Sequence, residues 1–349
     1  MASNSDADYV GKVLNEVRDQ IAVDDDVLSE TKARRNLVKR IAKKFEGALK
    51  TFDSGSVAHG TVNKPVSDAD CGVVLDRRTY PDLGPDGDDE PPNDIVQEMA
   101  EFVIEGVQEE YPDAEQEVGK RSIVITFNEP LEDESAEVED QDPSVDLIVA
   151  LTKAEGDGRW IPNTEARRWD ASDPEKHTEL LNGPTLRDRV HRARVIRLAK
   201  AAVKGDDSPV VSSFNVEALA LEHVDSDDTI AESLRDVFLD GADALELGDT
   251  PDPAGVSDPI KLPDGISRTE VVNRLREFGS ALEAAIDNSD DEERVRTELA
   301  RVFPDYVDVE TSGKEALANA LIAGDSAKVA SVVGAGSSGL KSTAAYGNG

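Results

Sequence analysis

Apolar and polar positions follow a helical period over residues 29–50. The side chains that share the apolar face are Leu37, Val38, Ile41, Ala42, Phe45, Ala48 and Leu49. The opposite face is basic and carries Lys32, Arg35, Lys39, Arg40, Lys43, Lys44 and Lys50, and Arg34 departs from the pattern. This spacing predicts one long amphipathic helix over 29–50.

Shorter apolar runs predict strands over 71–75, 122–127 and 144–151, with a helix over 95–110 between the first two. Three strands and one intervening helix indicate a small mixed sheet. The segment 81–94 is rich in Pro, Gly and Asp and is expected to be a surface insertion. The acidic segment 128–143 is expected to be a mobile loop or a long hairpin connection.

From about residue 160 the apolar spacing becomes helical throughout. The predicted helices are 185–204, 214–223, 227–239, 267–287, 291–303 and 313–323. Ser267 and Glu270 have the spacing of a capping box at the start of the fourth of these helices. Residues 325–349 are small and rich in Gly and Ser, which predicts a flexible tail.

The net charge of the chain indicates the kind of environment in which the protein works. The 349 residues include 74 acidic and 38 basic side chains, for a net charge of −36. Such an excess is typical of proteins from salt-loving archaea, in which concentrated salt screens the repulsion. The alternative, a disordered acidic protein, disagrees with the apolar segments that recur from residue 9 to residue 324.

Cysteine content and hydropathy exclude several classes of protein. The single cysteine, Cys71, excludes an internal disulfide framework and metal sites built on CxxC pairs. We find neither a signal peptide nor an apolar run of 18 residues, so we expect a cytoplasmic protein without a membrane partner.

The stretch GSVAHGTVNKPVSDADCGVVLD, residues 55–76, holds the candidate chemistry. Asp68 and Asp70 are two residues apart at the start of a strand and therefore point to the same face. Two adjacent carboxylates repel each other unless a cation lies between them, and a divalent metal ion with oxygen ligands meets that need. Asp146, where the strand 144–151 begins, is the expected third ligand. Asp142 lies in the preceding loop, and we expect Asp142→Asn to be nearly silent.

Upstream of this pair, Gly55 permits a tight turn with exposed backbone N–H groups, and Ser56 offers a hydroxyl. Together they are candidates to hold a triphosphate beside the metal. In so acidic a chain a DxD pattern also arises by chance. The order of the motifs, a Gly-Ser turn, then DxD, then a third acid opening a later strand, favours the chemical interpretation.

These residues resemble the DNA polymerase β-like nucleotidyltransferase superfamily, whose pattern is a Gly-Ser turn, a DxD and a distant third Asp on a small palm sheet. Later residues resemble its CD-NTase branch, the relatives of cyclic GMP-AMP synthase and oligoadenylate synthase. The matching residues are Trp169, Asp173-Pro174, His177, Arg197 to Lys200, and Ser213-Phe214 with Glu217. The resemblance covers roughly residues 29–225. It departs from many relatives at Cys71 and Gly72, where bulkier residues are common.

The resemblance implies an α+β fold with a palm, an N-terminal spine helix and a C-terminal helical lobe. The domains would be 1–155 for the palm with its spine helix, 156–324 for the helical lobe and 325–349 for the tail. It implies that Asp68, Asp70 and Asp146 bind Mg²⁺, with Mn²⁺ as an alternative. Gly55, Ser56, Lys200 and Ser213 would bind the triphosphate of a nucleoside triphosphate.

The resemblance further implies synthesis of a cyclic or linear oligonucleotide signal with release of pyrophosphate, in anti-phage defence. Two other functions stay open, namely a nucleotidyltransferase that modifies RNA or protein, and an inactive relative that binds nucleotide or RNA. The sequence does not decide the oligomeric state.

Several side chains have both a functional and a structural interpretation. The basic segments 32–50 and 187–204 would either face nucleotides, RNA or DNA, or pair with the surrounding acids. His59 would either contact substrate or support the fold. Trp160 and Trp169 would either stack on a base or pack in the core.

The net charge leads to a test on salt. Because self-repulsion destabilises the compact state when it is unscreened, we expect Tm to rise markedly between about 0.1 M and 2 M KCl, as the Debye length falls from about 10 Å to a few ångströms. Thermal melting across a KCl series measures this. A flat Tm would contradict the halophilic interpretation.

Overall fold

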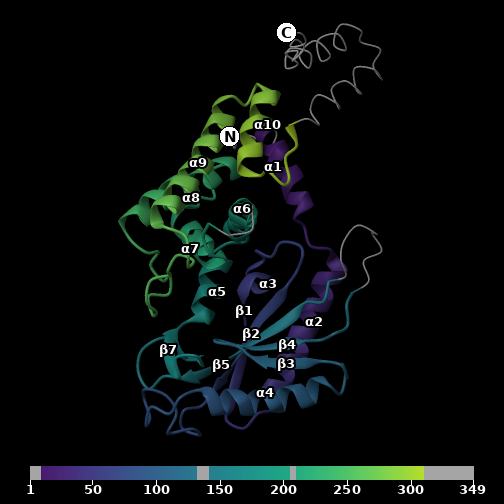
Figure 1. The fold of residues 1–349 in the computed structure, drawn as a ribbon, viewed down its shortest axis with the longest axis vertical. Helices are drawn as coiled ribbons and strands as arrows, with labels where there is room; N and C mark the ends of the chain where they lie inside the picture. Colours follow the sequence, from purple (N-terminus) through teal and green to yellow (C-terminus); the bar gives the residue numbers. More distant parts are fainter. Residues whose placement is uncertain (1–8, 132–140, 205–209, 310–349) are drawn as a thin grey trace, which may run out of the picture.

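Seven strands form one mixed sheet that organises half of the molecule (Figure 1). The structure is a computed structural model, and it describes residues 9–131, 141–204 and 210–309. The strand order is β1-β2-β5-β4-β3, with β6 and β7 added beside β5. The strands are β1 (Ala48–Ser54), β2 (Asp68–Leu75), β3 (Glu115–Val118), β4 (Ile123–Thr126), β5 (Ser144–Thr152), β6 (Arg159–Asn163) and β7 (Arg168–Ser172).

Helices α2 (Asp25–Ala42) and α4 (Asn93–Val107) cover one face of this sheet. Their apolar side chains share a core with alternate residues of β2, β4 and β5, among them Cys71, Ile125 and Leu147. The period of two in a strand places Asp68, Asp70 and Gly72 on the opposite face. We call the seven strands with α2, α4 and the short helix α3 (Gly55–His59) the palm.

A second core lies between helices and contains no strand residue in the part of the chain described. We call these helices the helical lobe. They are α1 (Tyr9–Gln20), α5 (Pro174–Asn182), α6 (Leu186–Lys204), α7 (Ser213–His223), α8 (Ile230–Leu247), α9 (Arg268–Asp287) and α10 (Glu292–Val302). None of the helices within the described ranges is both long enough and apolar enough to cross a lipid bilayer.

The predicted helix over 29–50 is wrong at both ends. The helix α2 runs from Asp25 to Ala42, and residues 48–54 form strand β1. Gly47, with a φ of +72°, reverses the chain between them. Leu49 is 46% exposed, so it does not belong to a buried helix face. The sequence of residues 48–50 continues the helical period, but these residues pair with β2 and therefore form a strand.

The N-terminal spine is divided between the two parts of the molecule. Val10, Val13, Leu14 and Val17 of α1 pack in the core of the helical lobe, whereas α2 packs on the sheet. Figure 1 shows α1 beside α10 and α2 alongside the strands. The spine therefore joins palm and lobe as two helices, and the break falls at residues 21–24.

The three predicted strands are confirmed as β2, β4 and β5. Four further strands were not predicted. Strands β3, β6 and β7 are short, β3 and β7 are largely polar, and the start of β1 continues the helical period of the preceding segment. Strands β6 and β7 lie within the range 156–324 assigned above to the helical lobe, yet they extend the palm sheet. The division of the chain into domains stays a prediction.

Most of the predicted helices are confirmed, including 95–110 as α4 and those that correspond to α6, α7, α9 and α10. The helix predicted over 227–239 is present as α8, but it runs from Ile230 to Leu247 and so extends eight residues further than predicted. The capping box at the start of α9 is present, since Ser267 and Glu270 bond reciprocally. The predicted helix 313–323, the tail 325–349 and part of the loop 128–143 lie outside the described residues.

The small residue at position 72, Gly72, is explained by its neighbour on β1. It lies opposite Phe52 in the register of β1 and β2. A Cβ atom at Gly72 would come within 2.1 Å of the Phe52 ring. Phe52 therefore occupies the space that a larger side chain at position 72 would need.

Arg34, the exception on the helical wheel, is a buried anchor between α2 and the segment before β5. Its side chain is 1% exposed and pairs with Asp142 at 2.5 Å and with Glu30 at 3.0 Å. It also donates to the carbonyls of Glu129 and Pro143. Asp142 is therefore a structural partner of a buried cation.

This contact revises the expectation that Asp142→Asn is nearly silent. Removing one partner of a buried charge leaves that charge less compensated. We expect Asp142→Asn to lower the free energy of unfolding by about 1–3 kcal/mol, measured by chemical denaturation in high KCl. Asp76→Asn is the control, because Asp76 pairs with the exposed Arg78. Equal stability of the two variants would contradict the anchor.

Candidate active site

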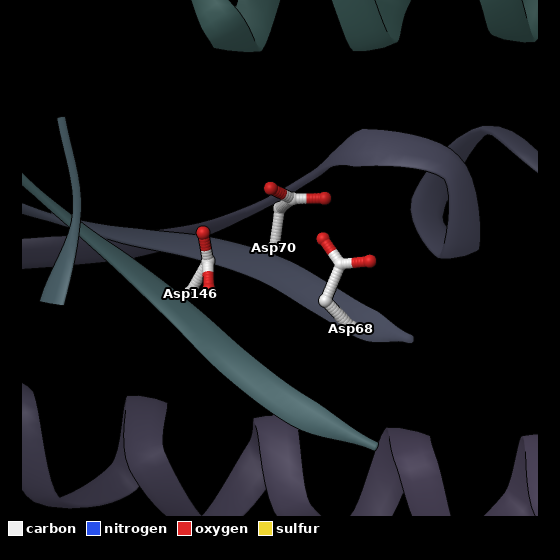
Figure 2. A group of neighbouring side chains, drawn as sticks. All are labelled: Asp68, Asp70 and Asp146. Atoms are coloured by element: carbon white, nitrogen blue, oxygen red, sulfur yellow. The ribbon is translucent and has the colours of Figure 1, made fainter. Parts of the chain in front are cut away.

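Three carboxylates meet on the sheet face that points away from α2 and α4. Asp68 and Asp70 come from β2 and Asp146 from β5, and oxygens from all three lie within 4.8 Å of one another (Figure 2). Because β2 and β5 are parallel neighbours in which Asp70 lies opposite Asp146, their register creates the cluster. The prediction that these three residues converge is confirmed.

Negative charge outweighs positive charge at this cluster, although Lys200 lies close enough to oppose the rise in the pKa of Asp70. Burial, together with the neighbouring Asp68 and Asp146 carboxylates, raises the pKa of Asp70 to about 7. Burial also raises the pKa of Asp146, against the hydrogen bond of 2.9 Å that the Ser122 hydroxyl donates to it. Three hard oxygen donors with uncompensated charge are suited to a divalent cation such as Mg²⁺.

Gly55 fits closely against this cluster. It begins α3 with a φ of +69°, a conformation that favours glycine. A Cβ atom there would lie 1.6 Å from Oδ2 of Asp70. The absence of a side chain at Gly55 therefore lets the turn at Gly55 and Ser56 approach the carboxylates directly.

A cleft of about 1670 Å³ runs between the palm and the helical lobe. Its palm wall includes Asp68, Asp70, Gly55 and Ser56, and Asp146 lies directly beside the first two. From the helical lobe, Lys200 of α6 and Ser213 at the start of α7 line the same cleft. The structure thus brings all seven predicted site residues to one place.

Lys200 is held by buried partners inside the cleft. Its Nζ lies 2.6 Å from Oε1 of Glu217 and 3.1 Å from Oγ1 of Thr61. Burial would raise the pKa of Glu217, but the hydrogen bond with His59 and the charge and hydrogen bond of Lys200 lower it to about 2. Glu217 is therefore an ionised, largely buried carboxylate in the wall of the cleft.

The histidines and tryptophans have structural surroundings. His59 is 4% exposed, and its ring nitrogens bond to Glu217 and Thr178. Trp169 is 4% exposed in the palm core, where its indole N–H donates to the Glu90 carbonyl. Trp160 packs against the same core, and its indole N–H donates to a carboxylate of the segment 81–94. The core alternative thus describes these tryptophans better than base stacking.

His177 of α5 holds the loop around Asp252, which borders the cleft, through a hydrogen bond. It pairs at 2.5 Å with Asp252, whose carboxylate also accepts three backbone N–H groups of its own loop. Those bonds and the His177 contact lower the pKa of Asp252 to about 2 against the effect of burial. Ser257 and Lys261 of the same loop line the cleft.

The two basic segments differ in position. Within 32–50 several cations pair with acids, namely Arg35–Asp53, Lys39–Asp53, Arg40–Glu110 and Lys50–Glu175. No residue of this segment, which the structure describes in full, is among those that line the cleft. The segment 187–204 contributes Lys200 and Lys204 to the cleft wall.

Sequence reasoning missed several residues of the cleft. Thr61 and Glu217, which hold Lys200, had no assigned role, although an acid in the apolar face of a helix was a signal of buried pairing. On the far wall, Asp170 accepts from Asn163 and pairs with Arg121 and Arg168. Asp170 and Arg168 lie in β7, Asn163 lies in β6, and Arg121 precedes β4. Because Arg121 lies far from the other three in sequence, their spacing does not predict that they meet.

The palm, its three aspartates and the helical lobe across the cleft have the fold of the DNA polymerase β-like nucleotidyltransferases, and a family match identifies the chain as a nucleotidyltransferase. Residues 9–183 match the model of the Second Messenger Oligonucleotide or Dinucleotide Synthetase domain, which is half of the chain. The chain therefore belongs to that family. No curated protein matches it.

Solved structures share this fold at low sequence identity. CdnC of E. coli MS115-1, in complex with HORMA-deltaN, has a TM-score of 0.60 and 17% identity, over 88% of this chain and 100% of that chain. CdnG of Bradyrhizobium diazoefficiens, in complex with GTP, has a TM-score of 0.62 and 14% identity, over 89% and 99%. Vibrio cholerae DncV, a cyclic AMP-GMP synthase with a bound linear intermediate, has a TM-score of 0.53 and 14% identity, over 86% and 88%.

The raised pKa of Asp70 predicts a pH-dependent cost of folding without metal. Because the folded protein favours protonated Asp70, the stability from this group is lost as pH rises from about 4 towards 7. Asp70→Asn does not titrate, so we expect it to be more stable than wild type by on the order of 2–4 kcal/mol at pH 8. The gap should close towards pH 5, measured by denaturation in EDTA at constant KCl.

Asp76→Asn is the control for that measurement. Hydrogen bonds from Arg78 lower the pKa of Asp76, so its replacement brings no such gain at pH 8. If Asp70→Asn is less stable than wild type at pH 8, the carboxylate supports the fold and the argument from repulsion is wrong.

Proposed function

We propose that this protein is a Mg²⁺-dependent nucleotidyltransferase that joins nucleoside triphosphates into a cyclic or linear oligonucleotide second messenger and releases pyrophosphate. One observation carries the proposal. The three carboxylates lie beside the turn at Gly55 and Ser56, on the wall of a cleft that Lys200 and Ser213 line from the other side.

Asp68, Asp70 and Asp146 would hold Mg²⁺, with Mn²⁺ as an alternative, because they offer oxygens within 4.8 Å of one another. When bound, a divalent metal neutralises charge on the phosphates and aligns the attacking oxygen. The Ser122 hydroxyl fixes one oxygen of Asp146, which leaves the other to face an attacking hydroxyl. This assignment gives the aspartates both metal-binding and positioning roles.

The triphosphate would lie between the palm and the helical lobe. Gly55 and Ser56 would hold the β- and γ-phosphates, since the turn lies against Asp70 without a side chain between them. Lys200 and Ser213 would contact the same triphosphate from α6 and α7. A lysine serves a phosphate as a point charge, and its amino group lies at the cleft wall.

Known neighbours support the choice of substrates. CdnG has been solved with GTP, CdnC with ATP, and DncV with the linear intermediate pppA(3′,5′)pG. We extend the proposal to a cytoplasmic enzyme of a haloarchaeon that acts in anti-phage defence. The acid excess supports the source, and the family resemblance supports the role. Nucleic acid is a proposed further partner of the segment 187–204 through Lys204.

Product analysis distinguishes this function from its rivals. Purified protein is incubated with all four nucleoside triphosphates and Mg²⁺ in high KCl, and mass spectrometry identifies the products. A cyclic or linear oligonucleotide with equivalent pyrophosphate supports the proposal. Nucleotide addition only when RNA or protein is supplied favours the modifying enzyme, and nucleotide binding without turnover favours the inactive relative.

Replacing any one of the three aspartates by Asn should remove most activity. Each change keeps the side-chain shape but removes a charged metal ligand, so we expect turnover to fall about 10³-fold or more, which corresponds to roughly 4 kcal/mol of transition-state stabilisation. Turnover is measured as pyrophosphate release, beside thermal melting to show that each variant folds. Asp76→Asn should keep wild-type turnover. Near wild-type turnover of Asp68→Asn would remove the metal site from the proposal.

A further inference from the structure

A network of largely buried polar side chains in the cleft wall joins the palm to the helical lobe. Glu217 of α7 is its centre. Its Oε1 accepts from the Thr61 hydroxyl at 2.7 Å and from the Lys200 ammonium at 2.6 Å. Its Oε2 lies 3.1 Å from Nδ1 of His59, at the end of α3. One carboxylate therefore contacts both the lysine and the short helix that begins at Gly55.

Burial makes these contacts strong. The side chains of Lys200 and Glu217 are 11% and 8% exposed, and that of His59 is 5% exposed. Hydrogen bonds to buried charged groups are stronger than neutral ones, and leaving one such partner unpaired is costly. The network thus fixes the direction in which the Lys200 ammonium points.

The ammonium has three N–H donors, and the network uses two of them, one for Glu217 and one for Thr61. The third is left for the cleft, whose wall includes Lys200. Asp70 is close enough for Lys200 to act on its pKa. A lysine freed from Glu217 would be drawn to that carboxylate and away from a triphosphate.

We propose that Glu217 is a positioning residue for nucleotide binding, which holds the Lys200 ammonium towards the triphosphate and keeps it from Asp70. The inference rests on the proposed function, since it takes the cleft as a triphosphate site. Glu217 touches neither substrate nor metal in this role. Its loss therefore weakens nucleotide binding much more than it slows the chemical step.

The test is Glu217→Gln, which keeps the shape and removes the charge. We expect the Kd for α,β-methylene-ATP with Mg²⁺, measured by calorimetry, to rise about tenfold, because the Lys200 ammonium loses the negative charge that holds it in place. The KM for nucleoside triphosphates should rise in parallel, while kcat stays within about threefold. Unchanged or tighter binding by folded Glu217→Gln would overturn the proposal.

Glu298→Gln is the matched control. Glu298 is also a buried glutamate of the helical lobe with two cationic partners, Arg294 and Arg301, but α10 contributes no residue to the cleft lining. A purely structural role for Glu217 predicts that both variants lose stability and neither changes the Kd. Positioning predicts that only Glu217→Gln changes the Kd.

A second variant decides the matter if Glu217→Gln does not fold. Thr61→Val removes the hydroxyl that bonds both Lys200 and Glu217 and keeps the side-chain shape. It should raise the Kd about threefold, and an unchanged Kd would overturn the proposal.

Lys200→Met separates this inference from the proposed function. If wild type does not bind the nucleotide, or if Lys200→Met binds it as tightly as wild type, the triphosphate site itself is wrong. If Lys200→Met binds weakly while folded Glu217→Gln binds normally, the site stands and only the role of Glu217 is wrong.

Discussion

Repulsion among three carboxylates on one face of a sheet is the constraint around which the rest of the molecule is arranged. Asp68, Asp70 and Asp146 are brought together by the parallel register of β2 and β5, which burial in the palm core enforces. Burial of Asp70 raises the pKa of its carboxyl group, because a buried negative charge without a cation beside it is unfavourable. A bound cation would therefore stabilise the site. In its absence, packing of the apolar core on the opposite face of the sheet offsets the repulsion among the carboxylates.

The sequence predicted those features that depend on residues close together in the chain, and it missed those that depend on pairing between distant segments. The DxD at a strand start and the third acid opening a later strand were local, and their convergence was predicted correctly. The β1 strand was missed because residues 48–50 continue the helical period, and only pairing with β2 decides their structure. Strands β6 and β7 were missed because short polar strands gain their stability from the sheet they extend.

Electrostatic pairing was the least predictable part. Pairing with acids was one of the two interpretations of the basic segment 32–50, but the sequence did not show that Arg34 and Arg35 are buried or that their partners are Asp142 and Asp53. Lys200 was expected at the triphosphate, but its contacts with Thr61 and Glu217 were not, because both residues are distant from it in sequence. In a chain with 74 acids, the sequence alone gives no means of telling which acid meets which cation.

The division of the spine has a mechanical consequence. With α1 in the helical lobe and α2 on the sheet, the described chain passes between the two parts twice, at residues 21–24 and at Asp173. Because two covalent links join the parts, any opening of the cleft would be constrained to a movement close to a rotation about the line between the links. Arg197 bonds the carbonyl of Ile21 and the side chain of Asn63, so it clamps one end of that axis. It lies one helical turn before Lys200, which places the pivot and the phosphate contact on the same helix.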